Sequence, residues 1–189
     1  SYMSGIYRNW ESFTFREYLK KFELPETKAI KDFSKGMKVK LAFAVALSHK
    51  AELLILDEAT SGLDPIIRDD ILDLLLDFVQ DETHAVLVSS HITSDLEKIA
   101  DYITFIHKGR LVFSHPKDDL VDNYGIISCG AVIFDSLDKS DIIAYRKEDY
   151  QFKVLVKNRH KAEKNYPKAI VEPAAIEDIM LFYVKGELQ

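Results

Sequence analysis

Apolar residues recur with the spacing of a helix in two stretches near the start of the chain. Across residues 10–24, aromatic and aliphatic side chains fall at i, i+3, i+4 and i+7, which predicts a helix with one buried face. Pro25 follows this stretch and should end the helix. A second helix is expected from an N-cap at Ser34 to about His49. The apolar side chains on the expected buried faces are Phe15, Tyr18, Leu19, Phe22, Met37, Leu41, Ala44 and Val45.

Short apolar runs then alternate with helical patterns. Residues 53–56 and 85–89 are apolar runs of the kind found in the buried strands of a parallel sheet. Between them, Asp64 before Pro65 marks the start of a helix, because a capping aspartate and a proline at the first helical position favour one. Thr93 can cap a further short helix. This alternation predicts right-handed crossovers on a largely parallel sheet. The helix after Pro65 should bury Ile71, Leu74, Leu75 and Phe78.

The alternating pattern ends in a predicted β-hairpin. Its strands are residues 102–106 and 110–113, which flank the turn residues Lys108 and Gly109. Beyond Pro116 the pattern changes, and we expect a small α+β appendage with a soft boundary near residues 115–125. The elements expected in this appendage are strands at 126–134 and 152–156 and a final helix that carries Ile176, Ile179, Met180, Tyr183 and Val184 on one face.

Composition narrows the class of protein. The 189 residues carry a net charge of −6 and are 47% hydrophobic, which is typical of a folded globular chain. Because there is no long Lys/Arg run, nucleic acid is not expected as a ligand. The single cysteine, Cys129, excludes an internal disulfide and a multi-cysteine metal centre, and it suits a reducing compartment. No apolar run reaches the roughly 18 residues that a membrane span needs.

Residues with catalytic chemistry follow the two predicted strands. Asp57 and Glu58 come directly after the first strand, and His91 comes just after the second. In open α/β sheets, ligands bind beyond the carboxyl ends of the strands. There, one carboxylate can hold Mg²⁺ through water, the second can deprotonate an attacking water, and a histidine can stabilise a transferring phosphoryl group. Each residue alone also fits an ordinary cap, turn or surface position.

The start of the second helix offers a further candidate site. Ser34, Lys35 and Gly36 fit a simple N-cap with a flexible glycine. The same three residues also fit an anion site, because exposed amides, the helix dipole and a lysine all favour negative charge.

Order and spacing together give these motifs a resemblance. Residues 33–37 resemble the signature motif of the ATP-binding cassette (ABC) ATPases, and residues 53–58 resemble the Walker B strand that ends in the catalytic glutamate. His91 resembles the switch histidine of this family. Asp57 follows Ser34 by 23 residues, and His91 follows Asp57 by 34, in the order that the family uses. The family's D-loop is matched by Ser61, Gly62, Leu63 and Asp64.

Four features depart from the family pattern. Lys35 and Met37 replace the usual residues of the signature motif, a variation associated with bacterial exporters of drugs and antibiotics, and Ala59 stands where proline is usual. No Gly-x-x-x-x-Gly-Lys-[Ser/Thr] loop is present, and the glutamine loop is not recognisable. Since position 1 is not methionine, we expect a chain truncated at its N-terminus, which by itself binds ATP poorly and hardly hydrolyses it.

The resemblance implies a fold in three parts. It is an α/β fold with a P-loop NTPase-type parallel sheet and a helical signature subdomain, incomplete at its N-terminus, together with the α+β appendage. The expected parts are a helical subdomain at 1–50, the C-terminal half of the ATPase core at 51–115 and the extension at 116–189.

The resemblance also implies roles for the motif residues. ATP and Mg²⁺ would be the cofactors, with Asp57 holding Mg²⁺ through water, Glu58 acting as general base and His91 contacting the γ-phosphate. The expected partners are a second ATP-binding cassette, identical or different, and a transmembrane permease. The subunit would lie in the cytoplasm, on the inner face of the cell membrane. The residues expected to reach the partner's nucleotide are Ser34, Lys35, Gly36 and Met37, and those expected to couple the two sites are Ser61, Gly62, Leu63 and Asp64.

Two alternatives belong to the same fold. A soluble cassette ATPase that acts on ribosomes or DNA usually has two cassettes or a long coiled coil, and the sequence shows neither a second copy nor sustained heptads. An inert partner that only donates a signature motif has no need of Glu58 and His91. The sequence therefore favours an ATPase subunit that energises a transporter, with export as the expected direction.

Overall fold

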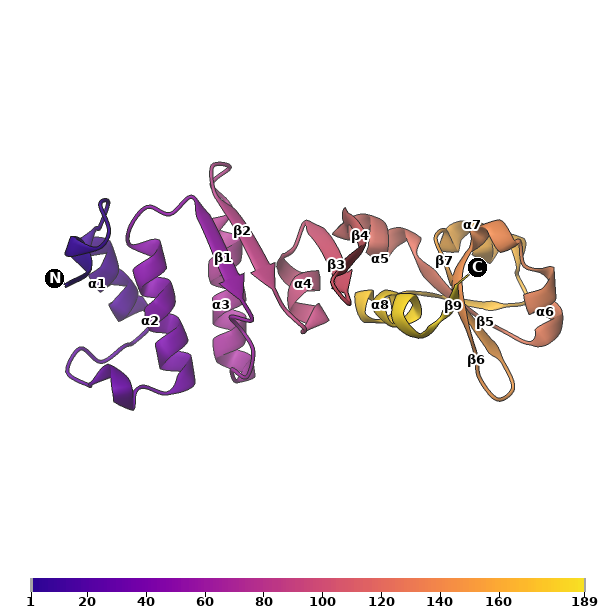
Figure 1. Cartoon of the computed structure of the whole chain (residues 1–189), viewed down its shortest axis with the longest axis horizontal. Helices are drawn as coiled ribbons and strands as arrows, with labels where there is room; N and C mark the ends of the chain where they lie inside the picture. The colour runs from indigo at the N-terminus through magenta and orange to yellow at the C-terminus, as the bar shows by residue number, and fades with distance from the viewer. Residues whose placement is uncertain (1, 189) are drawn as a thin grey trace. The chain divides into compact units, whose positions relative to one another are not determined.

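The chain folds as two units, residues 1–99 and residues 100–189. The computed structural model describes residues 2–188, and Figure 1 shows their helices and strands in order along the chain. The division between the units falls inside the segment 51–115 that the sequence groups as one part.

Side-chain caps fix the starts of two helices in the first unit. Ser34 Oγ accepts a hydrogen bond from the Met37 amide at 3.2 Å, and Asp64 Oδ1 accepts one from the Ile67 amide at 3.0 Å. Pro65 occupies the first turn, so both predicted helix starts are confirmed. The helices of this unit are η1 (Tyr2–Gly5), α1 (Ser12–Lys21), η2 (Ile30–Asp32), α2 (Lys35–Leu47), α3 (Pro65–Phe78) and α4 (Thr93–Ile99).

Helix α1 ends earlier than the spacing predicts, because Glu23 adopts a left-handed conformation with φ of 53° before the chain reaches Pro25. The side chains of Phe22 and Leu24 are still buried, so the apolar pattern continues past the end of the helix. Thr93 is the first residue of α4 and not its cap; Ser90 Oγ instead accepts a hydrogen bond from the Ile92 amide at 3.0 Å.

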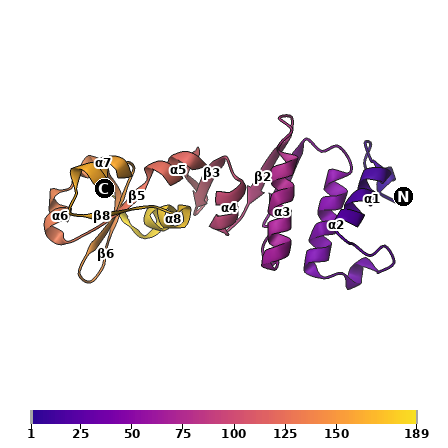
Figure 2. The ribbon, with the colours of Figure 1, turned by 180° about the vertical axis from the view of Figure 1, so that it is seen from behind.

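Strands β1 (Leu53–Asp57) and β2 (Ala85–Ser89) pair in parallel, as the sequence predicts. Helix α3 connects them and packs on one face of the pair, which Figure 1 shows from the strand side and Figure 2 from the helix side. The core on this face is built from apolar side chains of the strands and of α1 to α3, among them Leu54, Phe33, Phe43, Ala44, Ile71, Leu74 and Leu75.

The prediction that these strands are buried on both faces is wrong. Leu53 is 53% exposed, Ile55 70% and Leu87 63%. These residues alternate with the buried side chains, so they share the face of the sheet opposite α3. Among the described residues of the first unit, 2–99, no element covers that face.

The predicted hairpin is confirmed. Strands β3 (Tyr102–His107) and β4 (Arg110–Pro116) pair antiparallel around Lys108 and Gly109. Both turn residues have positive φ, 49° and 72°, which is the backbone of a two-residue turn that matches the twist of the strands.

The rest of the second unit surrounds an antiparallel sheet in the order β8-β5-β7-β6-β9. The chain order β5-α6-β6-β7-α7-β8 is the ferredoxin-like arrangement. Apolar side chains from α6 and α7 pack on one face of the sheet, and α8 packs on β6. The elements are α5 (Lys117–Asn123), β5 (Gly125–Cys129), α6 (Ala131–Ser136), η3 (Lys139–Asp141), β6 (Ile142–Lys147), β7 (Phe152–Val156), α7 (Arg159–Asn165), β8 (Ile170–Pro173), α8 (Ile176–Lys185) and β9 (Glu187–Leu188).

The sequence predicts this unit only in part. The strand at 152–156 and the final helix are confirmed. The strand predicted over residues 126–134 ends at Cys129, because Gly130 takes the N-cap position of α6. Strands β6 and β8 are missed, since charged residues interrupt their apolar positions.

A buried tyrosine gives this unit a testable response to alkaline pH. Tyr124 is 3% exposed, and burial together with the neighbouring Tyr183 raises its pKa to about 12. Because the neutral phenol is favoured in the folded state, the resulting stabilisation is complete below about pH 10 and is lost as pH rises through 12.

We expect one of the nine tyrosines to ionise well above the others in an absorbance titration, and Tyr124→Phe to remove that last step. If the titration of Tyr124→Phe differs from that of the wild type only near pH 10, Tyr124 is not shielded as described.

Candidate functional site

The carboxyl ends of β1 and β2 bring three polar residues together. Asp57 and Ser89 are register partners, and Ser89 Oγ donates a hydrogen bond to Asp57 Oδ1 at 2.5 Å. The Glu58 amide donates to the carbonyl oxygen of Ser89 at 3.1 Å, and it also lies 3.3 Å from Ser89 Oγ. Ser89 therefore links the two acidic residues to the neighbouring strand.

Glu58 and His91 form a pair at this edge. Glu58 Oε2 lies 2.6 Å from His91 Nδ1, and the two side chains are 40% and 66% exposed. The φ of Glu58 is +50°, a left-handed conformation that costs a non-glycine residue energy and that is common at functional sites. The pair is open to solvent, so a carboxylate that can accept a proton stands beside an imidazole that can hold or donate one.

The signature residues lie against the loop that follows β1. A Cβ atom on Gly62 would come within 2.6 Å of Lys35 Nζ, so the lysine ammonium lies over this glycine. Similarly, a Cβ on Gly36 would come within 2.5 Å of Ile67 Cδ1 at the start of α3. The beginning of α2 and the loop at 61–64 are therefore neighbours within one unit.

The loop at 61–64 is a tight turn. The Ser61 amide donates to the Glu58 carbonyl at 3.1 Å, and the Leu63 amide donates to the Thr60 carbonyl at 3.3 Å. Gly62 has a φ of +66°, which a glycine adopts without strain. The side chains of Met37 and Leu63 are half-buried against the core of the unit, whereas Ser34, Lys35, Gly62 and Asp64 are exposed or serve as caps.

Asp57 suits magnesium only as one ligand among several. It is an exposed carboxylate, and Mg²⁺ prefers oxygen ligands while keeping several waters. Within the part of the chain that the structure describes, no three His, Cys, Asp or Glu side chains could hold a metal together. Asp57 therefore fits a magnesium ion only if the other ligands come from outside the described side chains.

Sequence reasoning missed four residues that shape this edge. Ser89 follows the apolar run, but nothing in the sequence shows that its hydroxyl reaches Asp57. Thr60 and Asp95 are buried, and they form a polar cluster with the half-buried Arg68. Only the short separation of Thr60 from Glu58, and of Asp95 from His91, could have drawn attention to them.

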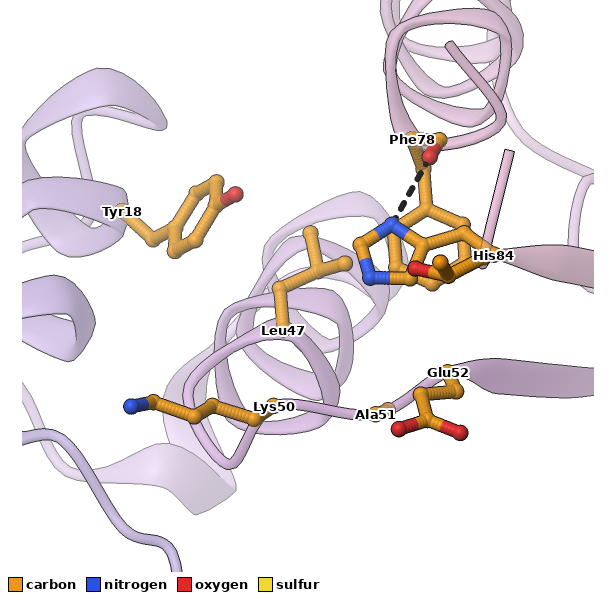
Figure 3. A pocket seen from close by; sticks show the side chains of 8 residues that line it. Tyr18, Leu47, Lys50, Ala51, Glu52, Phe78 and His84 are labelled. Carbon is orange, nitrogen blue, oxygen red and sulfur yellow. Dashed lines mark hydrogen bonds between the residues drawn. The ribbon is translucent and has the colours of Figure 1, made fainter. Parts of the chain in front are cut away.

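A separate cavity of about 360 Å³ opens at the other end of the same strands. It is lined by residues just before β1 and β2, Glu52 and His84 among them, and by Tyr18 and Leu47 (Figure 3). His84 Nδ1 lies 3.0 Å from the Phe78 carbonyl oxygen, and the two rings are stacked. Because parallel strands have their carboxyl ends at one edge, this cavity lies away from Glu58 and His91.

Within residues 2–188, no helix is both long enough and apolar enough to cross a membrane.

A solved structure shares the fold. It is described as an inward-facing conformation of a metal-chelate type ABC transporter, and it matches with a TM-score of 0.51 and 19% identity over 77% of this chain and 58% of that one. The chain therefore shares its mixed α/β fold with part of that ABC transporter.

Sequence comparisons also find similarity to ABC transporter proteins. Residues 3–61 match the ABC transporter family model. The ABC transporter ATP-binding protein YtrB of Bacillus subtilis is 30% identical over 63% of this chain and 41% of its own length. The lantibiotic transport ATP-binding protein SrtF of Streptococcus pyogenes is 39% identical over 49% and 40%, and the bacitracin transport ATP-binding protein BcrA of Bacillus licheniformis is 42% identical over 49% and 30%.

The chain is therefore similar to the ATP-binding proteins of ABC transporters. It spans less than half the length of each of these relatives.

Proposed function

We propose that this chain forms part of a subunit that binds and hydrolyses ATP to energise an ABC exporter. The observation that carries the proposal is the 2.6 Å pairing of Glu58 with His91 beside Asp57 at the carboxyl edge of a parallel strand pair. Two of the relatives are named for transport of a lantibiotic and of bacitracin, which supports transport of antibiotic-like peptides.

Each residue of the edge has a distinct task in this proposal. Glu58 accepts the proton of the attacking water. His91 orients the Glu58 carboxylate through Nδ1 and leaves its other ring nitrogen for the γ-phosphate. Asp57 would hold Mg²⁺ through water, and that ion would neutralise charge on the phosphates.

The signature residues serve a second nucleotide. Ser34, Lys35, Gly36 and Met37 begin a helix, whose exposed amides and positive dipole favour a phosphate, and Lys35 adds a charge. A second cassette, identical or different, would bring its nucleotide to this surface. Ser61, Gly62, Leu63 and Asp64 would couple the two sites, because Lys35 lies directly over Gly62.

Two further parts complete the assembly. The phosphate-binding loop Gly-x-x-x-x-Gly-Lys-[Ser/Thr] does not occur in residues 1–189, so the proposed ATP site would need such a loop from outside these residues. A transmembrane permease would use the free energy of ATP hydrolysis for transport. The subunit would therefore lie at the cytoplasmic face of the membrane.

The two histidines at opposite ends of β2 test this proposal. In the natural gene product that contains residues 1–189, His91→Ala should lower magnesium-dependent ATP turnover by about a hundredfold, since it removes a group that stabilises the transferring phosphoryl. His84→Ala is the matched control and should leave turnover within about twofold, because His84 precedes the strand at its other end. Equal turnover in the His91 variant and the wild type would remove His91 from the site.

A further inference from the structure

A buried carboxylate lies in the helix that follows His91. Asp95, in α4, is 2% exposed. Its Oδ2 accepts a hydrogen bond from Thr60 Oγ1 at 2.7 Å, and its Oδ1 accepts one from Arg68 Nε at 2.5 Å. Arg68 Nη2 forms an ion pair with the same oxygen and donates to Ser94 Oγ at 2.8 Å.

These bonds join three segments of the first unit. Thr60 is two residues after Glu58, in the turn that follows β1, and it is also buried. Arg68 is in the first turns of α3, and Asp95 is four residues after His91. The cluster therefore ties the loop that carries Glu58 to the loop that carries His91, with α3 as the third support.

The exposed pair needs such a support. Glu58 and His91 are open to solvent, and exposed ion pairs must restrict two side chains while water competes for them. A buried carboxylate that has all of its hydrogen-bonding partners is held in one arrangement. Moving it away from any of these partners would leave a buried polar group unpaired, which costs free energy. The cluster around Asp95, and not the exposed Glu58–His91 pair, therefore fixes the distance between the two loops.

We propose that Asp95 is a positioning residue that holds Glu58 and His91 in their working geometry through its bonds to Thr60 and Arg68. This inference rests on the proposed function for the pair. It adds a buried polar cluster to the residues on which ATP hydrolysis depends, although none of its members touches the nucleotide.

The experiment compares two substitutions of Thr60 in the natural gene product. Thr60→Val keeps the shape of the side chain but removes the hydroxyl that bonds to Asp95, whereas Thr60→Ser keeps the hydroxyl. We expect Thr60→Val to lower kcat at least about tenfold, because small displacements of reacting groups have large effects on rate. KM for ATP should stay within about twofold, and Thr60→Ser should restore kcat. Asp95→Asn, with Asp95→Glu beside it, is the second variant pair.

A spectroscopic readout separates this inference from the proposed function. With ¹³C-labelled histidine, the His91 ring resonance should move in Thr60→Val in the same direction as in Glu58→Gln, and should stay in place in Thr60→Ser. His160, in the second unit, is the internal reference. This readout does not depend on ATP hydrolysis. It therefore tests whether the cluster positions His91 even if Glu58→Gln and His91→Ala leave turnover unchanged and the proposed function fails.

If the His91 ring resonance of Thr60→Val stays at its wild-type position, the inference is overturned, whatever the turnover of this variant. An unchanged kcat in Thr60→Val, despite a moved resonance, overturns it as well. Trp10 fluorescence reports whether each variant is folded. If Asp95→Asn does not fold, the two Thr60 variants still decide.

Discussion

Glu58→Gln should slow ATP hydrolysis by at least about a hundredfold in the natural gene product while leaving ATP binding intact. The amide keeps the size and hydrogen-bonding capacity of the side chain near His91 but cannot accept a proton from water. Turnover is measured as phosphate release, and binding as retention of labelled nucleotide by the same preparation.

Glu52→Gln provides the control for this substitution. Glu52 immediately precedes β1 and Glu58 immediately follows it, so the two glutamates stand at opposite ends of one strand. The change at Glu52 should leave turnover within about twofold. Unchanged turnover in Glu58→Gln would mean that another group accepts the proton.

Ile71→Ala should lower the free energy of unfolding of the first unit by about 2 to 5 kcal/mol. Ile71 is 0% exposed in α3 and packs in the core between the helices and the strand pair. Truncation removes three buried carbon atoms and leaves a cavity that the neighbouring side chains fill only in part. Denaturation in urea, followed by the emission of Trp10, reports on this unit because Trp10 is the sole tryptophan of the sequence.

The same helix carries the matched control. Ile66 is 76% exposed, so Ile66→Ala should change the free energy of unfolding by no more than about 0.5 kcal/mol. Equal losses in the two variants would show that the two isoleucines do not differ in burial as described.

Local chemistry explains what the sequence predicts well. The caps at Ser34 and Asp64 depend on a side-chain oxygen and an amide three residues away, and the turn at Lys108 and Gly109 depends on two backbone conformations. Such features involve only neighbouring residues, so the sequence contains nearly all that determines them. The parallel pairing of β1 and β2 was also predictable, since a helical pattern separates the two apolar runs.

Burial depends on distant parts of the fold and was predicted less well. The apolar run at 53–56 suggests a strand covered on both faces, yet Ile55 is 70% exposed because no described element of the first unit lies over it. Asp95 shows the reverse case, since an acidic residue in the first turn of a helix is normally exposed. Its burial follows from the positions of Thr60 and Arg68, which are distant in sequence.

The assignment of ATP hydrolysis to the Glu58–His91 edge is tested most directly by a crystal structure of the Glu58→Gln gene product with magnesium and ATP. We expect the γ-phosphate at hydrogen-bond distance, about 3 Å, from His91, and an ordered water between that phosphate and the side chain at position 58. We also expect the magnesium ion to reach Asp57 through water. A triphosphate bound away from the carboxyl edge of β1 and β2 would contradict the assignment.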